Sequence, residues 1–244
     1  MQKFFIPNDN IDKNTAIIKG QDARHIAKVL RMCIKDKILF TNGKGIDFSS
    51  TITKLSPKEI TLTIDNTYSS EVESPVKITV FQGMLKDKKM DTLIRHLTEL
   101  GISAWTPFFC ERSIPKPDEK RVDSRLKRWE KITIEALKQC NRSIIPEINK
   151  PATFTDIIEK TAPFDLKITF WENASLPINK LKLQQKNIET IGILIGPEGG
   201  FSKKEVDFAE NAGFQVCGLG PRILRAETAS LTACSLIQHY FGDI

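Results

Sequence analysis

Charged residues that could do chemistry follow two short apolar segments near the carboxyl end of the chain. Glu198 follows the run Ile191–Ile195, and Arg225 follows the run Phe214–Leu219; both runs end in the dipeptide Gly-Pro. Apolar runs of this length, bounded by glycine and proline, are typical of buried strands. Two adjacent strand ends of this kind predict a small-molecule pocket at the carboxyl edge of an α/β sheet. Two ordinary strand-to-helix turns are the simpler alternative.

The same loops exclude several common kinds of site. The segment GPEGGF at 196–201 is not the G-x-G-x-x-G pattern of dinucleotide binding, and it lacks the Lys-Ser/Thr ending of a phosphate-binding loop. No G-x-S-x-G nucleophile elbow occurs anywhere in the chain. The pocket is therefore expected to hold a small molecule without nucleotide-phosphate chemistry.

Composition indicates a cytoplasmic protein with a polyanionic partner. The net charge is +6 and the pI is about 9.0. Residues 1–70 hold eleven Lys and Arg against seven Asp and Glu, so most of the excess lies there. No apolar run is long enough to span a membrane, and the first residues lack the apolar segment of a signal peptide. Five scattered cysteines and three histidines without ligand spacing predict no metal site.

The amino-terminal part predicts a small β-barrel with one basic helix. Strands are expected at 37–40, 48–54 and 60–64, separated by turns at 42–43 and 56–57. Asp22 is expected to cap a helix over 23–32 that presents Arg24, Lys28 and Arg31 on its polar face. We place this domain at 1–70 and a polar linker at 71–75.

From residue 76 to 244 the pattern alternates between strands and helices, which predicts a largely parallel sheet covered on both faces. Ser202 and Glu205 have the spacing of a capping box. Strands are expected at 76–81, 102–109, 166–171, 191–195 and 214–219, and helices at 90–100, 118–140, from 202 to near 213, and 228–240.

The two glycine-proline motifs, GPEGGFSKKE and LGPRILRAETA, resemble those of the SPOUT superfamily of methyltransferases. Within it, the chain is similar to the bacterial 16S ribosomal RNA uracil-N3 methyltransferase family. The resemblance extends over the whole chain and includes segments 25–31 with 42–43, 86–91, 98–101 with Pro107, and Glu135-Ala136 through Pro146. Cys140 stands where the family would have a small polar residue, a minor departure.

This resemblance implies a fold and an activity that residue spacing does not show. The fold would be α/β, with a SPOUT-type catalytic domain that contains a carboxy-terminal trefoil knot and follows a small PUA-like β-barrel. The cofactor would be S-adenosylmethionine. The substrate would be a single uridine, position 1498, in 16S ribosomal RNA of the small subunit, methylated at N3. The family works as a homodimer in which the partner subunit completes each active site.

The strand ends and glycine loops supply the apolar walls and backbone groups that such a cofactor needs. We assign cofactor binding to a set of residues at these ends: Leu194, Ile195, Gly196, Gly199, Gly200, Leu219, Gly220, Ile223, Leu224, Phe170 and Glu172. For Glu172, an ordinary strand-end carboxylate is an equally good explanation.

The reaction suggests two catalytic residues. As the N3 proton leaves, negative charge spreads onto the uracil carbonyl oxygens, and a cation placed there stabilises the transition state. Arg225 is the expected cation, with an ion pair to Glu227 or Glu198 as the alternative role. Glu198 could organise the loop, orient Arg225 or act as a general base, and we favour loop organisation because an exposed carboxylate is a weak base.

RNA contacts are expected from basic residues outside the pocket: Arg24, Lys28, Arg31, Arg112 and Arg142, with Arg121, Arg125 and Arg128 on the long helix. For most of them a solvated helix face is an equally good explanation. A SPOUT enzyme for another RNA, such as transfer RNA, and a non-catalytic RNA-binding assembly factor remain alternative functions. A small-molecule enzyme fits least well, because it leaves the basic amino-terminal part unexplained.

Overall fold

The computed structural model describes residues 3–86, 88–113, 119–161, 163–181 and 188–244. The chain forms two compact units. The first consists of Met1–Glu73 and Ile134–Ile145, and the second of Ser74–Thr133 and Pro146–Ile244. The long helix α3 (Glu119–Cys140) thus contributes residues to both. Nothing in its sequence indicates this division, because the amphipathic pattern continues through it.

Unit 1 is a six-stranded sheet with one short helix, α1, and the last residues of α3. The strand order is β1-β4-β5-β6-β3-β2; β1 pairs with β4 in parallel and the other pairs are antiparallel. Alternate residues of the strands and the inner face of α1 form one apolar core, in which the rings of Phe40 and Phe48 stack 4.7 Å apart. The elements are β1 (Lys3–Phe5), β2 (Ile11–Asp12), β3 (Thr15–Lys19), α1 (Gly20–Lys28), β4 (Lys37–Thr41), β5 (Ile46–Leu55) and β6 (Glu59–Ser69), with a 3-10 turn at Asn8–Asn10.

Helix α1 begins earlier and ends earlier than the sequence predicted. Its N-cap position is Lys19, which makes no side-chain cap, so the expected cap by Asp22 is wrong. Asp22 lies in the first turn, where a carboxylate is favoured by the helix dipole, and it accepts a hydrogen bond from Lys138 Nζ at 3.1 Å. Arg31 follows the helix in a left-handed conformation, with φ 52°, and therefore does not share its polar face.

Two buried ion pairs hold residues 134–145 within unit 1. Lys3 Nζ lies 2.9 Å from Asp47 Oδ2 and also donates to the Asn141 carbonyl and to Ser143 Oγ. Arg142 lies 2.7 Å from Glu73, whose other carboxylate oxygen accepts the backbone N–H of Ser143. Because both pairs are shielded from water and share several hydrogen bonds, removing either partner should be costly.

Unit 2 is a parallel α/β sheet. The strand order is β10-β8-β7-β13-β11-β14-β12, with β9 paired to β8, and every pairing is parallel. The elements besides α3 are β7 (Lys77–Gly83), α2 (Lys89–Glu99), β8 (Ala104–Phe109), β9 (Glu147–Ile148), β10 (Ala152–Thr153), α4 (Phe154–Lys160), β11 (Leu166–Phe170), β12 (Leu176–Pro177), β13 (Thr190–Ile195), α5 (Lys203–Asn211), β14 (Gln215–Gly218) and α6 (Ala226–Phe241), with a 3-10 turn at Ile178–Lys180.

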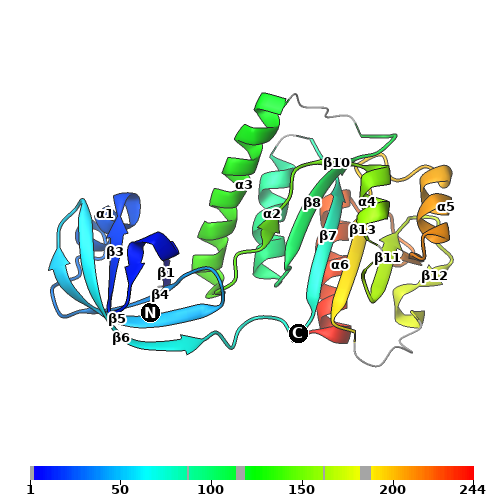
Figure 1. Ribbon diagram of the computed structural model, residues 1–244. Coiled ribbons are helices and arrows are strands. Elements are labelled where there is room, and N and C mark those ends of the chain that lie inside the picture. Colours follow the sequence, from blue (N-terminus) through cyan, green and yellow to red (C-terminus); the bar gives the residue numbers. More distant parts are fainter. Residues whose placement is uncertain (1–2, 87, 114–118, 162, 182–187) are drawn as a thin grey trace. The chain divides into compact units, whose positions relative to one another are not determined.

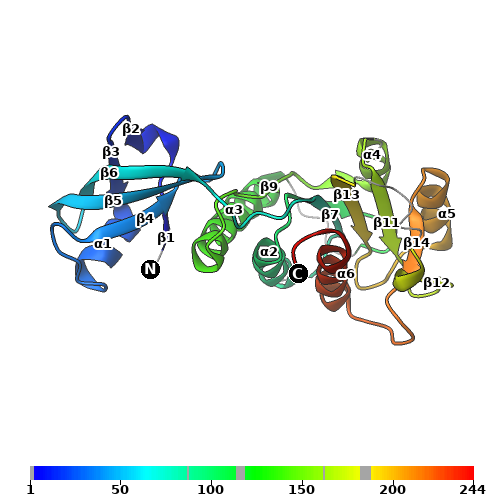
Figure 2. The ribbon, with the colours of Figure 1, turned by 90° about the horizontal axis from the view of Figure 1, so that it is seen from below.

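Helices cover both faces of this sheet (Figures 1 and 2). Helices α2 and α6 lie on one face, and α4 and α5 on the other. Successive strand residues alternate between the two cores: Val80 packs beneath α2 and α6, whereas Phe81 packs on the side of α4 and α5. The expectation of a parallel sheet covered on both faces is confirmed.

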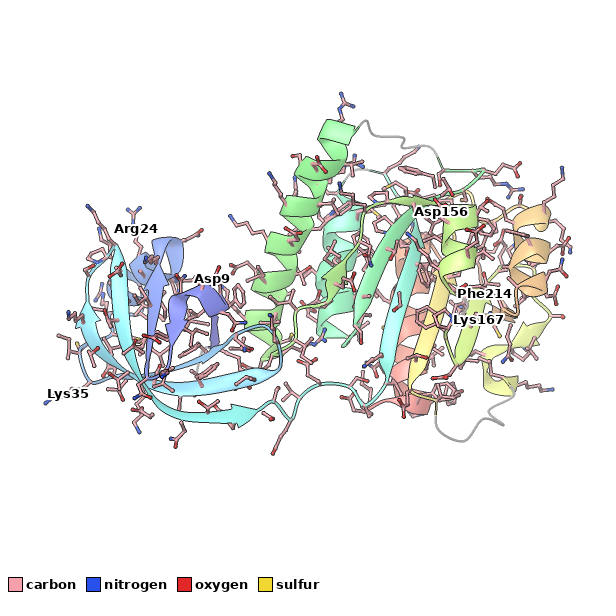
Figure 3. The ribbon with its side chains drawn as sticks, viewed as in Figure 1. Asp9, Arg24, Lys35, Asp156, Lys167 and Phe214 are labelled. Carbon is pink, nitrogen blue, oxygen red and sulfur yellow. The ribbon has the colours of Figure 1, made fainter. Side chains whose placement is uncertain are left out.

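The order of the strands corrects one sequence prediction. The two glycine-proline strands, β13 and β14, are not adjacent, because β11 lies between them and pairs with both. The two-residue strands β9, β10 and β12 and the short helix α4 were not predicted. Helix α4 does carry a readable signal, since Thr153 and Asp156 form a capping box at its start (Asp156 is labelled in Figure 3).

The buried pair of Lys3 and Asp47 gives a test of the unit 1 architecture. We expect Asp47→Asn to lower the free energy of unfolding of unit 1 by about 3 kcal/mol, because it leaves the Lys3 ammonium buried without its counter-charge. The matched control is Glu59→Gln, which removes the partner of Lys19 in a half-exposed pair and should cost less than about 1 kcal/mol. Denaturant titration measures both; equal losses would show that the buried pair does not hold unit 1 together.

Candidate functional site

A pocket of about 370 Å³ opens at the carboxyl edge of the unit 2 sheet. It lies where β13, β11 and β14 end and where α6 begins. This volume falls in the range of small-ligand sites. The lining residues are Lys89, Phe170, Trp171, Glu172, Ile195, Gly196, Pro197, Glu198, Gly199, Gly200, Phe201, Leu219, Gly220, Arg222, Ile223, Leu224, Arg225, Ala226 and Ala229.

The loop 196–200 after β13 requires glycine for steric reasons. Gly200 has φ 66°, which L side chains rarely adopt, and its N–H donates to the Pro197 carbonyl at 2.9 Å. A Cβ on Gly200 would stand 2.8 Å from Glu172 Oε1, and a Cβ on Gly199 would stand 3.1 Å from the Cβ of Arg112. The loop is therefore packed closely between the end of β11 and the segment after β8.

The end of β7 approaches the same loop even more closely. A Cβ on Gly83 would stand 2.5 Å from the backbone nitrogen of Pro197 and 2.8 Å from the carbonyl carbon of Gly196. Backbone atoms cannot move aside as a flexible side chain can, so only glycine fits at this strand end. The contact fixes the height of the loop above the sheet.

Lys89 connects two carboxylates at the pocket. Its Nζ lies 3.1 Å from Glu198 Oε1 and 3.4 Å from Glu227 Oε1, and Glu198 Oε1 also accepts the N–H of Lys86. Burial alone raises the pKa of Glu198, but the hydrogen bonds from Lys86 and Lys89 outweigh it and hold the pKa below its ordinary value. Glu198 is therefore a carboxylate that organises the loop and is poorly suited to accept a proton.

Arg225 occupies the N-cap position of α6 and is exposed at the pocket. The alternative role as a partner of Glu198 or Glu227 is not seen, because Lys89 takes both carboxylates. Within the described part of the chain no carboxylate pairs with Arg225. Its guanidinium is thus available to a bound molecule.

A capping box positions the far side of the pocket loop. The Ser202 side chain accepts from the backbone N–H of Glu205, and Glu205 accepts in return from Ser202, as the sequence predicted. Glu205 also accepts the N–H of Glu111 at 2.8 Å. Next to it, Arg112 Nη1 donates to the Gly199 carbonyl at 3.0 Å, which brings Arg112 to the pocket loop.

Most of the residues assigned to the cofactor line the pocket, whereas Leu194 does not. Leu194 is fully buried, and its side chain packs in the core beneath α4 and α5, because successive strand residues point to opposite faces. Its side chain therefore supports the strand and faces away from the pocket. Sequence reasoning missed Lys89, which lines the pocket from outside the two motifs, and Phe201, which lies within the first motif. For the residues that do line it, ligand contact stays a prediction.

The basic residues expected to contact RNA fall into different settings. Arg24 and Lys28 are exposed and lie four residues apart on α1; Figure 3 shows Arg24 pointing outward. Arg31 is exposed beyond the helix end. Arg142 is only 4% exposed and is bound by Glu73, so the structure gives it an internal role instead of the expected phosphate contact.

Two arginines of α3, Arg125 and Arg128, have partners in unit 2. Arg128 forms an ion pair with Asp91 of α2, and Arg125 lies against the sulfur of Met84. These contacts compete with a role in RNA binding. In the described residues no group of three or more His, Cys, Asp or Glu could hold a metal ion, and no helix there is long and apolar enough to cross a membrane.

Two protein-family models match the chain. Residues 18–65 match an RNA methyltransferase PUA domain, and residues 72–238 match an RNA methyltransferase domain. The first match lies in unit 1, and the second includes the whole pocket. Fold and site together define the class of RNA methyltransferases.

Similar proteins specify the class further. Ribosomal RNA small subunit methyltransferase E of Buchnera aphidicola is 36% identical over 96% of this chain and 92% of its own, and that of Bacillus subtilis is 30% identical over 98% and 96%. The solved ribosomal RNA small subunit methyltransferase E of Neisseria gonorrhoeae, bound to S-adenosyl methionine, has a TM-score of 0.89 at 30% identity and covers 100% of this chain and 99% of its own. A putative methyltransferase of Legionella pneumophila, solved with bound SAM, also has a TM-score of 0.89, at 29% identity, with the same coverage.

The chain belongs to the ribosomal RNA small subunit methyltransferase E family. The resemblance found in the sequence is thereby confirmed.

The close approach at Gly83 predicts a local effect of adding one carbon. Gly83→Ala should lower the free energy of unfolding by about 1–3 kcal/mol and speed amide hydrogen exchange in the loop 196–200, because the Gly196–Pro197 peptide must move. Gly192→Ala in β13 is the control, since its added Cβ makes only ordinary van der Waals contacts, with the rings of Phe164 at 3.4 Å and Phe81 at 3.5 Å. Unchanged loop exchange in the Gly83 variant would show that this contact does not set the loop.

Proposed function

We propose that this chain transfers a methyl group from S-adenosylmethionine to N3 of one uridine, position 1498, in 16S ribosomal RNA. The observation that carries the proposal is the glycine-walled pocket at the ends of β13, β11 and β14. Two neighbours with nearly the same fold are solved with this cofactor bound.

The residues present fit the cofactor. Ile195, Leu219 and Leu224 offer apolar walls for a flat adenine ring, and the glycine loops bring backbone groups close without side-chain bulk. The indole N–H of Trp171, a lining residue, is buried without a partner among the described residues and could donate to a bound molecule. When bound, S-adenosylmethionine supplies an electrophilic methyl group.

Arg225 stabilises the reacting base in this proposal. N3 of uracil is a poor nucleophile while it carries its proton, and charge builds on the neighbouring carbonyl oxygens as the proton leaves. An exposed guanidinium without a protein carboxylate partner can donate to one of those oxygens and favour the transition state over the ground state. Lys89 supports this role by occupying Glu198 and Glu227.

Unit 1 supplies RNA affinity in the proposal, as an RNA-binding domain over 1–70 joined by a linker at 71–75. Arg24, Lys28 and Arg31 are exposed there and are suited to phosphate contacts. Arg112, which lies against the pocket loop, is placed to contact RNA near the target. The target uridine leaves its stack to reach the pocket.

We further propose that the carboxy-terminal part is a trefoil knot. The supporting observation is the path of the chain after β14. Strand β14 lies beyond β11 in the sheet, yet α6 returns past β13, and its Ser230 hydrogen-bonds to Gln82 of β7. This return passes the loop 196–200, as a threaded chain would. Knots are otherwise rare, so the topology alone would not have predicted one.

A homodimer is the proposed assembly. A second groove of unit 2, of about 870 Å³, lies between residues of α2, α3 and α6 and shares Lys89 with the pocket. It combines apolar Leu93 and Leu231 with charged Asp91 and Arg128. A second copy seated here would place its residues beside the active site.

The proposal predicts the effect of removing Arg225. Arg225→Ala should bind S-adenosylmethionine as the unmodified chain does but lose at least about 100-fold in kcat for transfer of labelled methyl to small-subunit RNA, the size of effect seen when a charge-stabilising donor is removed. Arg95→Ala, which removes an exposed arginine of α2, is the control and should transfer normally.

Calorimetry measures the binding of S-adenosylmethionine, and labelled RNA retained on a filter measures methyl transfer, so the two steps are followed separately. Normal transfer by Arg225→Ala would contradict the catalytic assignment. Failure of the unmodified chain to bind S-adenosylmethionine would instead favour a non-catalytic RNA-binding role.

A further inference from the structure

Gln82 is a fully buried amide at the end of β7 that no motif singled out. Its Nε2 donates to the Gly83 carbonyl at 3.0 Å and to the Gly196 carbonyl at 3.2 Å, and its Oε1 accepts from Ser230 Oγ. A primary amide has two N–H donors and one acceptor oxygen. The amide nitrogen and the amide oxygen of Gln82 therefore both have hydrogen-bond partners. Two of these partners, Gly196 and Ser230, lie far from Gln82 in the sequence.

The partners of Gln82 belong to two different walls of the pocket. Gly196 begins the loop after β13 and lines the pocket. Ser230 is one turn into α6 and is 1% exposed; it lies next to Ala229, which also lines the pocket, and follows the turn that starts at Arg225. Both walls of the pocket, the loop after β13 and the start of α6, thus contact the side chain of Gln82 in β7.

Gly83 strengthens this interpretation because it brings the same strand end into backbone contact with Gly196 and Pro197. The contact at Gly83 fixes how near the loop lies, and the amide of Gln82 fixes its orientation by holding a carbonyl. An apolar side chain of the same size would fill the space but leave the Gly196 carbonyl buried without a donor.

We propose that Gln82 is a positioning residue that holds the loop 196–200 and the first turns of α6 in the geometry that binds the methyl donor. The inference rests on the proposed function of the pocket. It predicts that cofactor affinity depends on the amide group of Gln82 and not only on the volume of its side chain. It also predicts that the effects of changing Gln82 and Ser230 are not additive.

Four variants test the proposal against a matched control. Gln82→Glu keeps the shape but cannot donate to the Gly196 carbonyl, and Gln82→Leu removes all three contacts. Ser230→Ala removes the contact between Gln82 and α6 together with the bond from Ser230 Oγ to the Ala226 carbonyl, and the double variant combines it with Gln82→Leu. Thr133→Val is the control, because it removes another buried hydroxyl of unit 2 that donates within α3 to Trp129.

The measurements are the Kd for S-adenosylmethionine by calorimetry, KM and kcat for methyl transfer, and the thermal midpoint without ligand. Gln82→Glu and Gln82→Leu should raise the Kd and the KM for the cofactor about tenfold, the size of one buried hydrogen bond. Ser230→Ala should raise them about threefold, and the double variant should equal Gln82→Leu because, once the amide is gone, the hydroxyl retains only its bond to the Ala226 carbonyl within α6. Thr133→Val should bind as the unmodified chain does.

The outcomes separate the inference from the function it rests on. If the unmodified chain does not bind S-adenosylmethionine, the proposed function fails. If it binds, and the folded Gln82 variants bind equally well below their thermal midpoint, Gln82 supports only stability and the inference is overturned. Should the Gln82 variants not fold, Ser230→Ala decides alone: a threefold loss supports the inference, and an unchanged Kd contradicts it.

Discussion

Parallel pairing throughout the unit 2 sheet is the constraint on which the site depends. Because β7, β13, β11 and β14 run in one direction, their carboxyl ends meet at one edge, and the loops that follow them must share that space. Close packing there leaves no room for a side chain at Gly83 and makes one at Gly200 crowd Glu172. The pocket lies between these loops, whose backbones come so close together that only glycine fits at the contacts.

Charge is distributed at the pocket in a way that follows from this packing. The loop 196–200 brings Glu198 to Lys89, and the start of α6 brings Glu227 to the same ammonium. The hydrogen bond to Glu198 raises the pKa of Lys89 above its ordinary value; burial acts against this rise, and the charge of Glu227 acts with it. Lys89 is therefore charged at neutral pH and lies within ion-pair distance of both carboxylates. Arg225, one residue before α6, lines the pocket with no carboxylate partner among the described residues.

Much of this architecture could be predicted from the sequence. Apolar periodicity located the main strands and helices of unit 2, because buried parallel strands leave a clear apolar run. The capping box at Ser202 and Glu205 could also be predicted, because it depends only on two residues three positions apart. Most pocket residues within the two glycine-proline motifs were also found, although Phe201 was missed and the assigned residue Leu194 faces the core instead of the pocket.

What the sequence could not show depends on contacts between distant segments. The position of β11 between β13 and β14 is one example, because the order of strands in a sheet cannot be predicted from local sequence patterns. Lys89, at the start of α2, and Gln82, near the end of β7, bond to the loop 196–200 from more than a hundred residues away in the sequence. Arg142 looked like a surface cation because its partner, Glu73, lies in another segment. In each case a contact between segments distant in the sequence decides the arrangement.

The central claim is that the pocket delivers a methyl group to one uridine of small-subunit ribosomal RNA. Its most direct test is mass-spectrometric mapping of 16S ribosomal RNA from cells that lack this protein, beside the same cells with the gene restored. The account predicts that N3-methyluridine at position 1498 is absent in the first and present in the second. An unchanged modification at that position, with a methyl group missing from transfer RNA or another RNA instead, would contradict it.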